Sequence, residues 1–219
     1  MSFTAILSGI FEGFGVTATV TLLGMLYAVP FALAFGILQY FTRGWRNMLV
    51  TAIIEIWRST PILVLMFVFY YTLPGLGITL SGITVGAMTL GLHIGAYGSQ
   101  SVRAALQALD RGQVEAGFAL GLKRRQILWS IELPQAFGAM TPTFVNQFIQ
   151  LVKGTALVSL ITLSDMTHRA MEINQLTFDP AGIYSALLIA YVMICYPATI
   201  FGRWLEKRTV PQGRGNREL

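Results

Sequence analysis

Long apolar runs separated by short polar segments dominate this chain. No Asp, Glu, Lys or Arg occurs between Glu12 and Arg43, and none occurs between Arg58 and Arg103. A helix needs roughly 20 apolar residues to cross the hydrocarbon core of a bilayer. Because a backbone in lipid must satisfy its hydrogen bonds within the segment, these runs predict transmembrane helices.

Turn residues divide the apolar runs into five expected transmembrane helices. Pro74–Gly77 and Ser81–Gly82 split the second uncharged stretch into two helices. The helices are expected within residues 12–43, 47–73, 83–108, 135–163 and 181–204. A straight helix over 135–163 would measure roughly 43 Å, so a tilt or a break is expected, and Gly154 is the candidate break. The fold class is all-α integral membrane protein.

The basic residues are distributed unequally between the two sides of this topology. Thirteen of the 15 Lys and Arg lie in one set of loops and in the C-terminal segment. Because positive charge favours the cytoplasmic side, the N-terminus is expected outside and the C-terminus in the cytoplasm. The net charge of +5 is thereby explained without nucleic acid. Residues 1–208 are expected to form a single transmembrane domain, and 209–219 a mobile cytoplasmic tail.

The sequence offers no chemistry of its own. With 54% hydrophobic and 11% charged residues, its composition is that of a membrane protein. It has no phosphate-binding G-x-x-x-x-G-K-[ST] motif, no spacing typical of a metal site and no nucleophile–base pair. Cys195 is the only cysteine, so a disulfide within the chain is excluded. We expect no catalytic residue, no metal ligand and no cofactor in this chain.

The polar segment between the third and fourth expected helices has a structure of its own. It predicts a short helix from Gln113 to Leu120 that ends at Gly121, then an amphipathic helix that ends at Pro134. Small side chains on the first helix would allow another protein surface to approach closely. The alternative is a surface helix that lies on lipid beside a basic cluster. That cluster is Lys123, Arg124 and Arg125.

This segment resembles the EAA loop of ABC importer permeases. The matching residues are Glu115, Ala116, Leu120, Gly121, Leu133 and Pro134. Gly117 stands where the family usually has a second alanine. The resemblance implies that the segment is a coupling helix, which docks on a separate ATPase subunit.

Other motifs are similar to the polar amino acid branch of that family. They are Trp57–Pro61, Ala96–Tyr97, Leu133–Ala136, Asn146–Phe148 and Lys153–Ser159, and the resemblance covers residues 13–208. It implies a multi-pass permease of the bacterial cytoplasmic membrane that forms half of a translocation path. The implied partners are an identical or unlike second permease, two ATP-binding subunits carrying ATP and Mg, and an extracytoplasmic solute-binding protein. Opines or zwitterionic compatible solutes are alternative cargoes, and an ATP-independent channel or secondary carrier is the alternative class.

Seven residues are candidates for the substrate path. They are Ser59, Thr60, Tyr97, Gln100, Lys153, Thr155 and Asp165. Pro61 would bend its helix and expose the two hydroxyl groups before it, unless these residues form an ordinary first turn. Gln100 stands where the branch often has Glu, so it loses a charge that could hold an ammonium group, or it bonds a neighbouring helix. Lys153 is a charge within a span and is therefore either functional or snorkelling.

Overall fold

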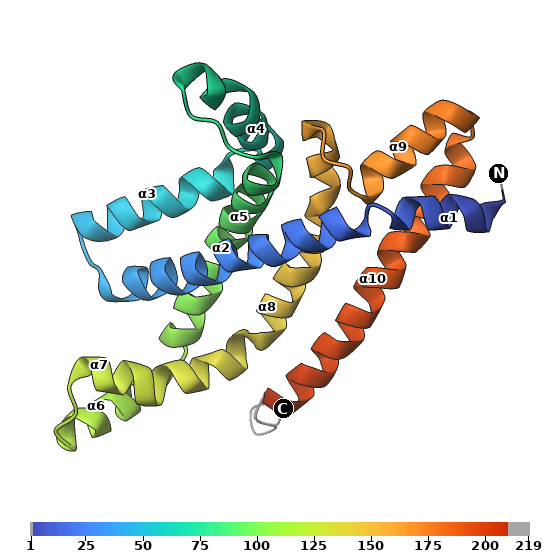
Figure 1. Ribbon diagram of the computed structural model, residues 1–219. Coiled ribbons are helices and arrows are strands. Elements are labelled where there is room, and N and C mark those ends of the chain that lie inside the picture. The colour runs from blue at the N-terminus through green and yellow to red at the C-terminus, as the bar shows by residue number, and fades with distance from the viewer. Residues whose placement is uncertain (1, 210–219) are drawn as a thin grey trace.

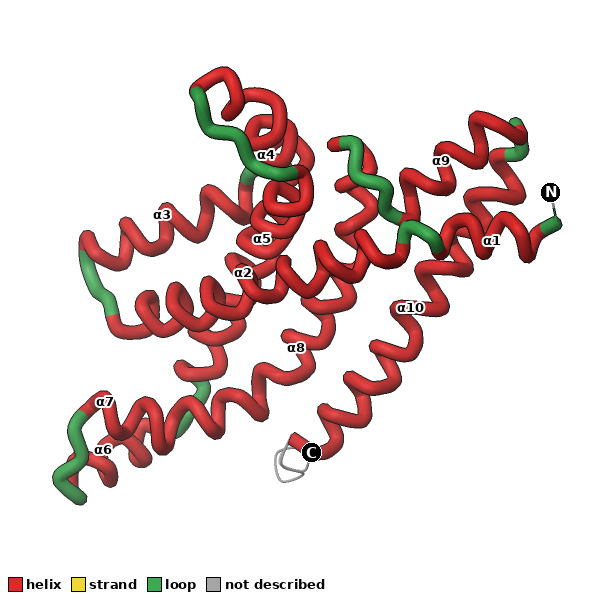
Figure 2. Tube along the Cα trace, in the orientation of Figure 1, coloured by secondary structure: helices red, strands yellow, loops and turns green. Residues whose placement is uncertain are grey.

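The computed structural model describes residues 2–209, and its secondary structure there is helical throughout (Figures 1 and 2). The α-helices are α1 Phe3–Phe11, α2 Phe14–Phe41, α3 Trp45–Ser59, α4 Ile62–Phe67, α5 Gly82–Gln107, α6 Arg111–Ala119, α7 Arg124–Ile127, α8 Leu133–Gly154, α9 Met166–Thr177 and α10 Pro180–Thr209. Two π-helical turns, η1 Val68–Thr72 and η3 Leu128–Glu132, and two 3₁₀ segments, η2 Leu73–Leu76 and η4 Thr155–Ile161, complete the order. The predicted all-helical class is confirmed.

The centre of the fold is the crossing of α2 and α5, which glycines bring into close contact. A Cβ atom at Gly91 would lie 2.3 Å from the carbonyl oxygen of Gly24, and one at Gly95 would lie 2.8 Å from that of Ala28. The backbones therefore meet without side chains between them, as at small-residue contacts in membranes. Around this crossing α2, α4, α5, α8 and η4 share one apolar core. Its buried residues are Val20, Met66, Val85, Ala87, Leu90, Leu151, Val158 and Ile161.

A second apolar core joins α1, α9 and α10 (Figure 1). Helix α1 was not predicted as a separate element, because the apolar pattern around it gave no sign of a turn before Phe14. The turn lies at Glu12–Gly13, where a Cβ on Gly13 would lie 2.4 Å from the carbonyl carbon of Asp165. Arg169 of α9 also forms an ion pair with Glu12. Glycine at residue 13 thus lets the start of α2 contact the loop before α9.

By length and composition, three described helical stretches are able to cross a membrane. They are Phe3–Phe41, Arg124–Ile161 and Pro180–Thr209. A fourth candidate is the pair of segments Trp45–Ser59 and Ile62–Leu76, which meet at a bend of 92°. Helix α5 is continuous over 26 residues, as expected, but it is less apolar and is not among these candidates. The predicted total of five spans and the orientation therefore remain predictions.

Two sequence expectations about helix ends need correction. The single helix expected over 47–73 is broken at Thr60 and Pro61, because proline cannot donate to the preceding turn. Pro134 does not end a helix; it lies in the first turn of α8, where no backbone donor is needed. The break expected at Gly154 is confirmed, because α8 ends there and the chain continues as the 3₁₀ segment η4. The expected tail after Thr209 lies outside the described residues.

Candidate functional site

Helix α6 is a short helix with well-formed ends, in the polar segment between α5 and α8 (Figure 1). The carboxylate of Asp110 accepts a hydrogen bond of 2.8 Å from the backbone N–H of Gly112 and so caps the first turn. At the other end Gly121 adopts a left-handed conformation with φ of +77°, and Leu122 N–H donates to the Gly117 carbonyl over 3.0 Å. The predicted helix and its glycine stop are both present.

The two faces of α6 differ in exposure. Gly117 is buried against α7, and a Cβ there would lie 2.8 Å from a side-chain carbon of Ile127. Glu115, Ala116 and Leu120 face away from the molecule, and Leu120 is 79% exposed. An exposed leucine on a short, capped helix gives an apolar contact point for another surface. The departure at Gly117 from the usual alanine thus lies on the inner face of α6.

A buried ion pair fixes α7 to the membrane helices. Glu132 is 1% exposed and pairs with Arg124, whose second nitrogen donates to the same carboxylate over 3.0 Å. The hydroxyl of Tyr40, near the end of α2, donates to this carboxylate over 2.9 Å. The Arg124 guanidinium also lies 4.7 Å from the ring centre of Phe41. Sequence reasoning missed this cluster, although an acid between Ile131 and Leu133 was a visible signal.

Leu133 and Pro134 continue from this ion pair into α8. Leu133 is buried at 3% exposure in an apolar cluster with Val102, Leu106 and Met140. Pro134 is exposed at the start of α8. The loop motif thus contains two kinds of residue, an exposed set on α6 and a buried leucine that anchors the return to the bundle.

A mixed polar cavity of about 510 Å³ lies between α4, α5 and α8. Its polar lining residues are His93, Tyr97, Ser101, Thr143, Gln147 and Gln150. Its apolar and backbone lining comes from Ile62, Leu90, Ile94, Gly154 and Leu157. The volume is that of a small-molecule site, and the polar groups are neutral hydrogen-bonding groups and one histidine.

The bend after α3 is packed against the same part of α5. The Nδ1 atom of His93 lies 2.7 Å from the Trp57 carbonyl oxygen. Arg58 pairs with Glu55 at 2.5 Å, and its guanidinium lies 5.0 Å from the ring centre of Tyr97. The broken helix is therefore tied to the helix that lines the cavity.

Comparisons with known proteins identify the family. Residues 28–211 match the family described as binding-protein-dependent transport system inner membrane component. The chain belongs to this family. It is 36% identical over 212 residues to a probable amino-acid ABC transporter permease of Sinorhizobium fredii strain NBRC 101917 / NGR234, covering 94% of this chain and 89% of that protein. It is 34% identical over 206 residues to a probable glutamine ABC transporter permease of Bacillus subtilis strain 168, covering 92% of this chain and 94% of that protein.

A solved structure agrees with the sequence comparisons. The chain is similar, with a TM-score of 0.84 and 26% identity, to a chain from the crystal structure of an amino acid ABC transporter with histidines, covering 95% of this chain and 99% of that one. The predicted identity as a permease subunit of a bacterial ABC importer, and with it the multi-pass location in the inner membrane, is confirmed.

In this permease the residues predicted for the substrate path do not form one site. Tyr97 lines the mixed polar cavity. The hydroxyl groups of Thr60 and Thr155 each donate over 2.7 Å to carbonyls of their own helix, at Ile56 and Val152. The Ser59 hydroxyl donates to Glu55 over 3.3 Å. None of these three hydroxyls lines the cavity.

The other three predicted path residues also lie outside the lining of the mixed polar cavity. Gln100 donates over 2.9 Å to the side-chain oxygen of Gln39, and the side-chain N–H of Gln39 donates over 2.8 Å to the hydroxyl of Thr51. Lys153 is exposed and has no ion pair within residues 2–209. Asp165 is fully buried and caps α9 through the N–H groups of Thr167 and His168, at 3.1 and 2.9 Å. Burial raises the pKa of Asp165 above its usual range, and the cap hydrogen bonds oppose that rise.

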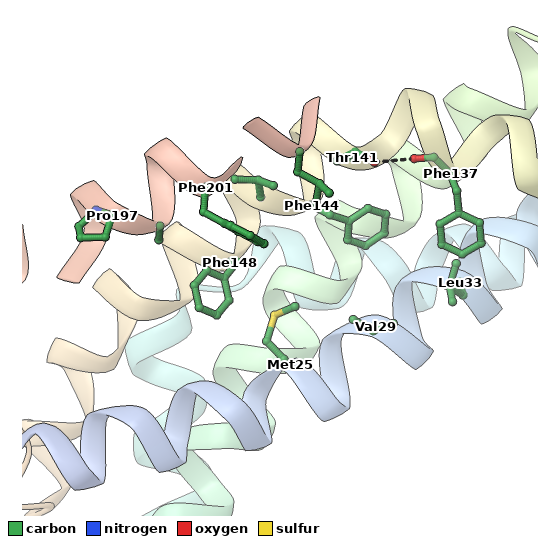
Figure 3. Close-up of a pocket in the computed structure, with 12 residues that line it drawn as sticks. Met25, Val29, Leu33, Phe137, Thr141, Phe144, Phe148, Pro197 and Phe201 are labelled. Atoms are coloured by element: carbon green, nitrogen blue, oxygen red, sulfur yellow. Dashed lines mark hydrogen bonds between the residues drawn. The ribbon is translucent and has the colours of Figure 1, made fainter. Parts of the chain in front are cut away.

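A larger groove of about 720 Å³ between α2, α8 and α10 is apolar (Figure 3). The hydroxyl of Thr141 is engaged by donating over 2.9 Å to the Phe137 carbonyl, and phenylalanine side chains fill much of the lining. A polar solute would lose its hydration here without gaining hydrogen bonds, which costs several kcal/mol. Of the two, the mixed polar cavity is the better candidate for the solute.

Proposed function

We propose that this chain provides half of the translocation path of an ATP-driven importer for a polar amino acid or a related solute. The observation that carries the proposal is α6, a capped helix whose Glu115, Ala116 and Leu120 are exposed while Gly117 packs inward. In this proposal α6 is the coupling helix. The coupling residues are Glu115, Ala116, Gly117, Leu120, Gly121, Leu133 and Pro134.

The proposed assembly has two permeases, two ATP-binding subunits that hold ATP and Mg, and an extracytoplasmic solute-binding protein. The chain has five transmembrane helices in this proposal, with its N-terminus outside and α6 and its C-terminus in the cytoplasm. The distribution of Lys and Arg supports that orientation. The two relatives named above, a probable amino-acid permease and a probable glutamine permease, support an amino acid as cargo.

Direct contacts connect α6 with the membrane helices, so a force on α6 would be transmitted to them. Gly117 contacts Ile127 of α7, and the ion pair of Arg124 with Glu132 connects α7 with Tyr40 of α2. Because α7, η3 and α8 follow one another without a loop, displacement of α7 also moves α8. Helix α8 carries Gln147 and Gln150 of the mixed polar cavity, so closure of the ATPase would change the shape of that cavity.

The mixed polar cavity is the proposed solute contact of this subunit. Its described lining contains no carboxylate and no Lys or Arg, so it would bind a polar solute through neutral hydrogen bonds. Of the path residues predicted from the sequence, Tyr97 lines this cavity. We keep Ser59, Thr60, Gln100, Lys153, Thr155 and Asp165 as path residues only in the sense that they shape the surrounding helices.

The coupling role is tested by crosslinking and by uptake. A cysteine at Ala116 is expected to capture the ATP-binding subunit in the assembled complex, whereas a cysteine at Leu176, which is 83% exposed on α9, is the matched control. Leu120→Asp is expected to reduce ATP-driven uptake at least tenfold with normal insertion, and Leu176→Asp is not. Capture at Leu176 rather than Ala116, or normal uptake by Leu120→Asp, would contradict the proposal.

A further inference from the structure

A second polar cavity, of about 680 Å³, lies where the ends of α2 and α5 meet α6 and α7. In Figure 1 these elements converge at the lower left of the molecule. The charged lining residues are Arg43, Arg103, Arg111, Arg124 and Glu132. Polar lining also comes from Gln39, Thr42, Asn47 and Gln107. We call it the arginine cavity, and it shares no lining residue with the mixed polar cavity.

The arginine cavity has an excess of positive charge. Four arginines face one carboxylate, and Glu132 is already paired with Arg124. Within residues 2–209, Arg43, Arg103 and Arg111 have no acidic partner within 4.0 Å. Three positive charges that share a recess repel one another unless an anion lies between them.

Hydrogen bonding in the arginine cavity is incomplete as well. The Nε atom of Arg103 and the Oδ1 atom of Asn47 are buried and have no hydrogen-bond partner among the described residues. Buried polar atoms in folded proteins are nearly always bonded, so each exception calls for an explanation. Both residues line the cavity, and a bound molecule with acceptor and donor oxygens would satisfy them.

We propose that the arginine cavity binds a phosphate group. Guanidinium groups form paired hydrogen bonds with phosphate oxygens, and a phosphate would reduce the repulsion among three otherwise unpaired guanidiniums. The cavity is large enough for more than phosphate alone. Because it lies at the ends of α2 and α5, the phosphate can belong to a phospholipid headgroup or to a soluble phosphate compound.

Such a phosphate would connect elements that belong to different parts of the permease. Arg111 is the first residue of α6 and Arg103 belongs to α5, whereas Arg43 lies between α2 and α3. A phosphate bound by all three would hold the start of α6 against the membrane helices. Binding does not depend on whether α6 contacts an ATPase, so this inference goes beyond the proposed function.

The test uses the full-length chain in its assembled permease complex, purified in a detergent without phosphate for the titration and reconstituted in mixed nanodiscs for the lipid count. Inorganic phosphate is titrated calorimetrically, and phosphatidylglycerol retained from mixed nanodiscs is counted by native mass spectrometry. Arg103→Gln and Arg43→Gln are each expected to weaken binding about tenfold or more. Arg43 is exposed, so its variant is expected to fold normally. The control is Arg125→Gln, which changes an exposed arginine beside Arg124 but outside the cavity lining.

The outcomes are distinct. Binding of phosphatidylglycerol alone that both cavity variants weaken assigns the site to a lipid headgroup, and the same result with inorganic phosphate alone assigns it to a soluble compound. Binding of both probes with the same sensitivity supports the shared phosphate chemistry. The proposal is overturned if neither probe binds, if both cavity variants bind normally, or if Arg125→Gln weakens binding equally. None of these results affects the crosslinking test of α6.

Discussion

The ion pair of Arg124 and Glu132 gives the most quantitative prediction, because one partner is buried and the other is partly exposed. Glu132→Gln keeps the shape of the side chain but leaves Arg124 without its counter-charge. Loss of one partner from a buried pair costs roughly 3–5 kcal/mol. The Arg124 side chain is 31% exposed, so water compensates part of the loss, and we expect about 3 kcal/mol, the lower end of that range.

The assay is reversible unfolding of the purified chain in mixed micelles, followed by circular dichroism. A double-mutant cycle with Arg124→Gln separates the pair from its surroundings, because the double variant contains no unpaired charge. We expect the double variant to lose at least about 1 kcal/mol less than the sum of the two single losses. A loss below about 0.5 kcal/mol for Glu132→Gln, or additive losses, would refute the view that this pair fixes α7 to α2.

Three further predictions concern the inner face of α6, the glutamine pair and the cap of α9. Gly117→Val is expected to destabilise the chain by about 1–3 kcal/mol and to uncouple ATP hydrolysis from uptake, because its side chain would collide with Ile127; coupled uptake at normal stability would contradict this. Gln100→Leu is expected to cost about 1 kcal/mol through its bond to Gln39 and to leave the KM for the solute unchanged; a tenfold change in KM, measured by uptake, would make Gln100 a solute ligand. Because the folded pKa of Asp165 is raised, its contribution to stability is complete below the ordinary value of 3.8 and is lost as the pH rises through the folded pKa. Asp165→Asn should therefore reduce the difference in unfolding free energy between about pH 4 and about pH 7, and an unchanged difference would exclude this burial effect.

The sequence was sufficient for those parts of the fold that depend on local signals. Gly121 has no Cβ to oppose a left-handed conformation, and this made the end of α6 predictable. Pro134 was misjudged because the same ring that ends a helix is acceptable in a first turn, and η3 places it there. Helix α1 was missed because the turn at Gly13 follows from its contact with the Asp165 backbone, far along the chain.

The substrate path was harder to predict, because a polar side chain in a membrane helix forms a hydrogen bond with any backbone carbonyl within reach. Thr60 and Thr155 illustrate this, since each hydroxyl bonds to a carbonyl three or four residues earlier. Sequence identifies such residues as polar and intramembrane but does not show whether they have a partner. Polar groups remain available to a solute only where neighbouring helices leave a cavity between them, as α4, α5 and α8 do beside Tyr97 and Gln147. The helices around this cavity are held by long-range contacts such as that of the α3 bend with His93, so the cavity forms only when the bundle is assembled.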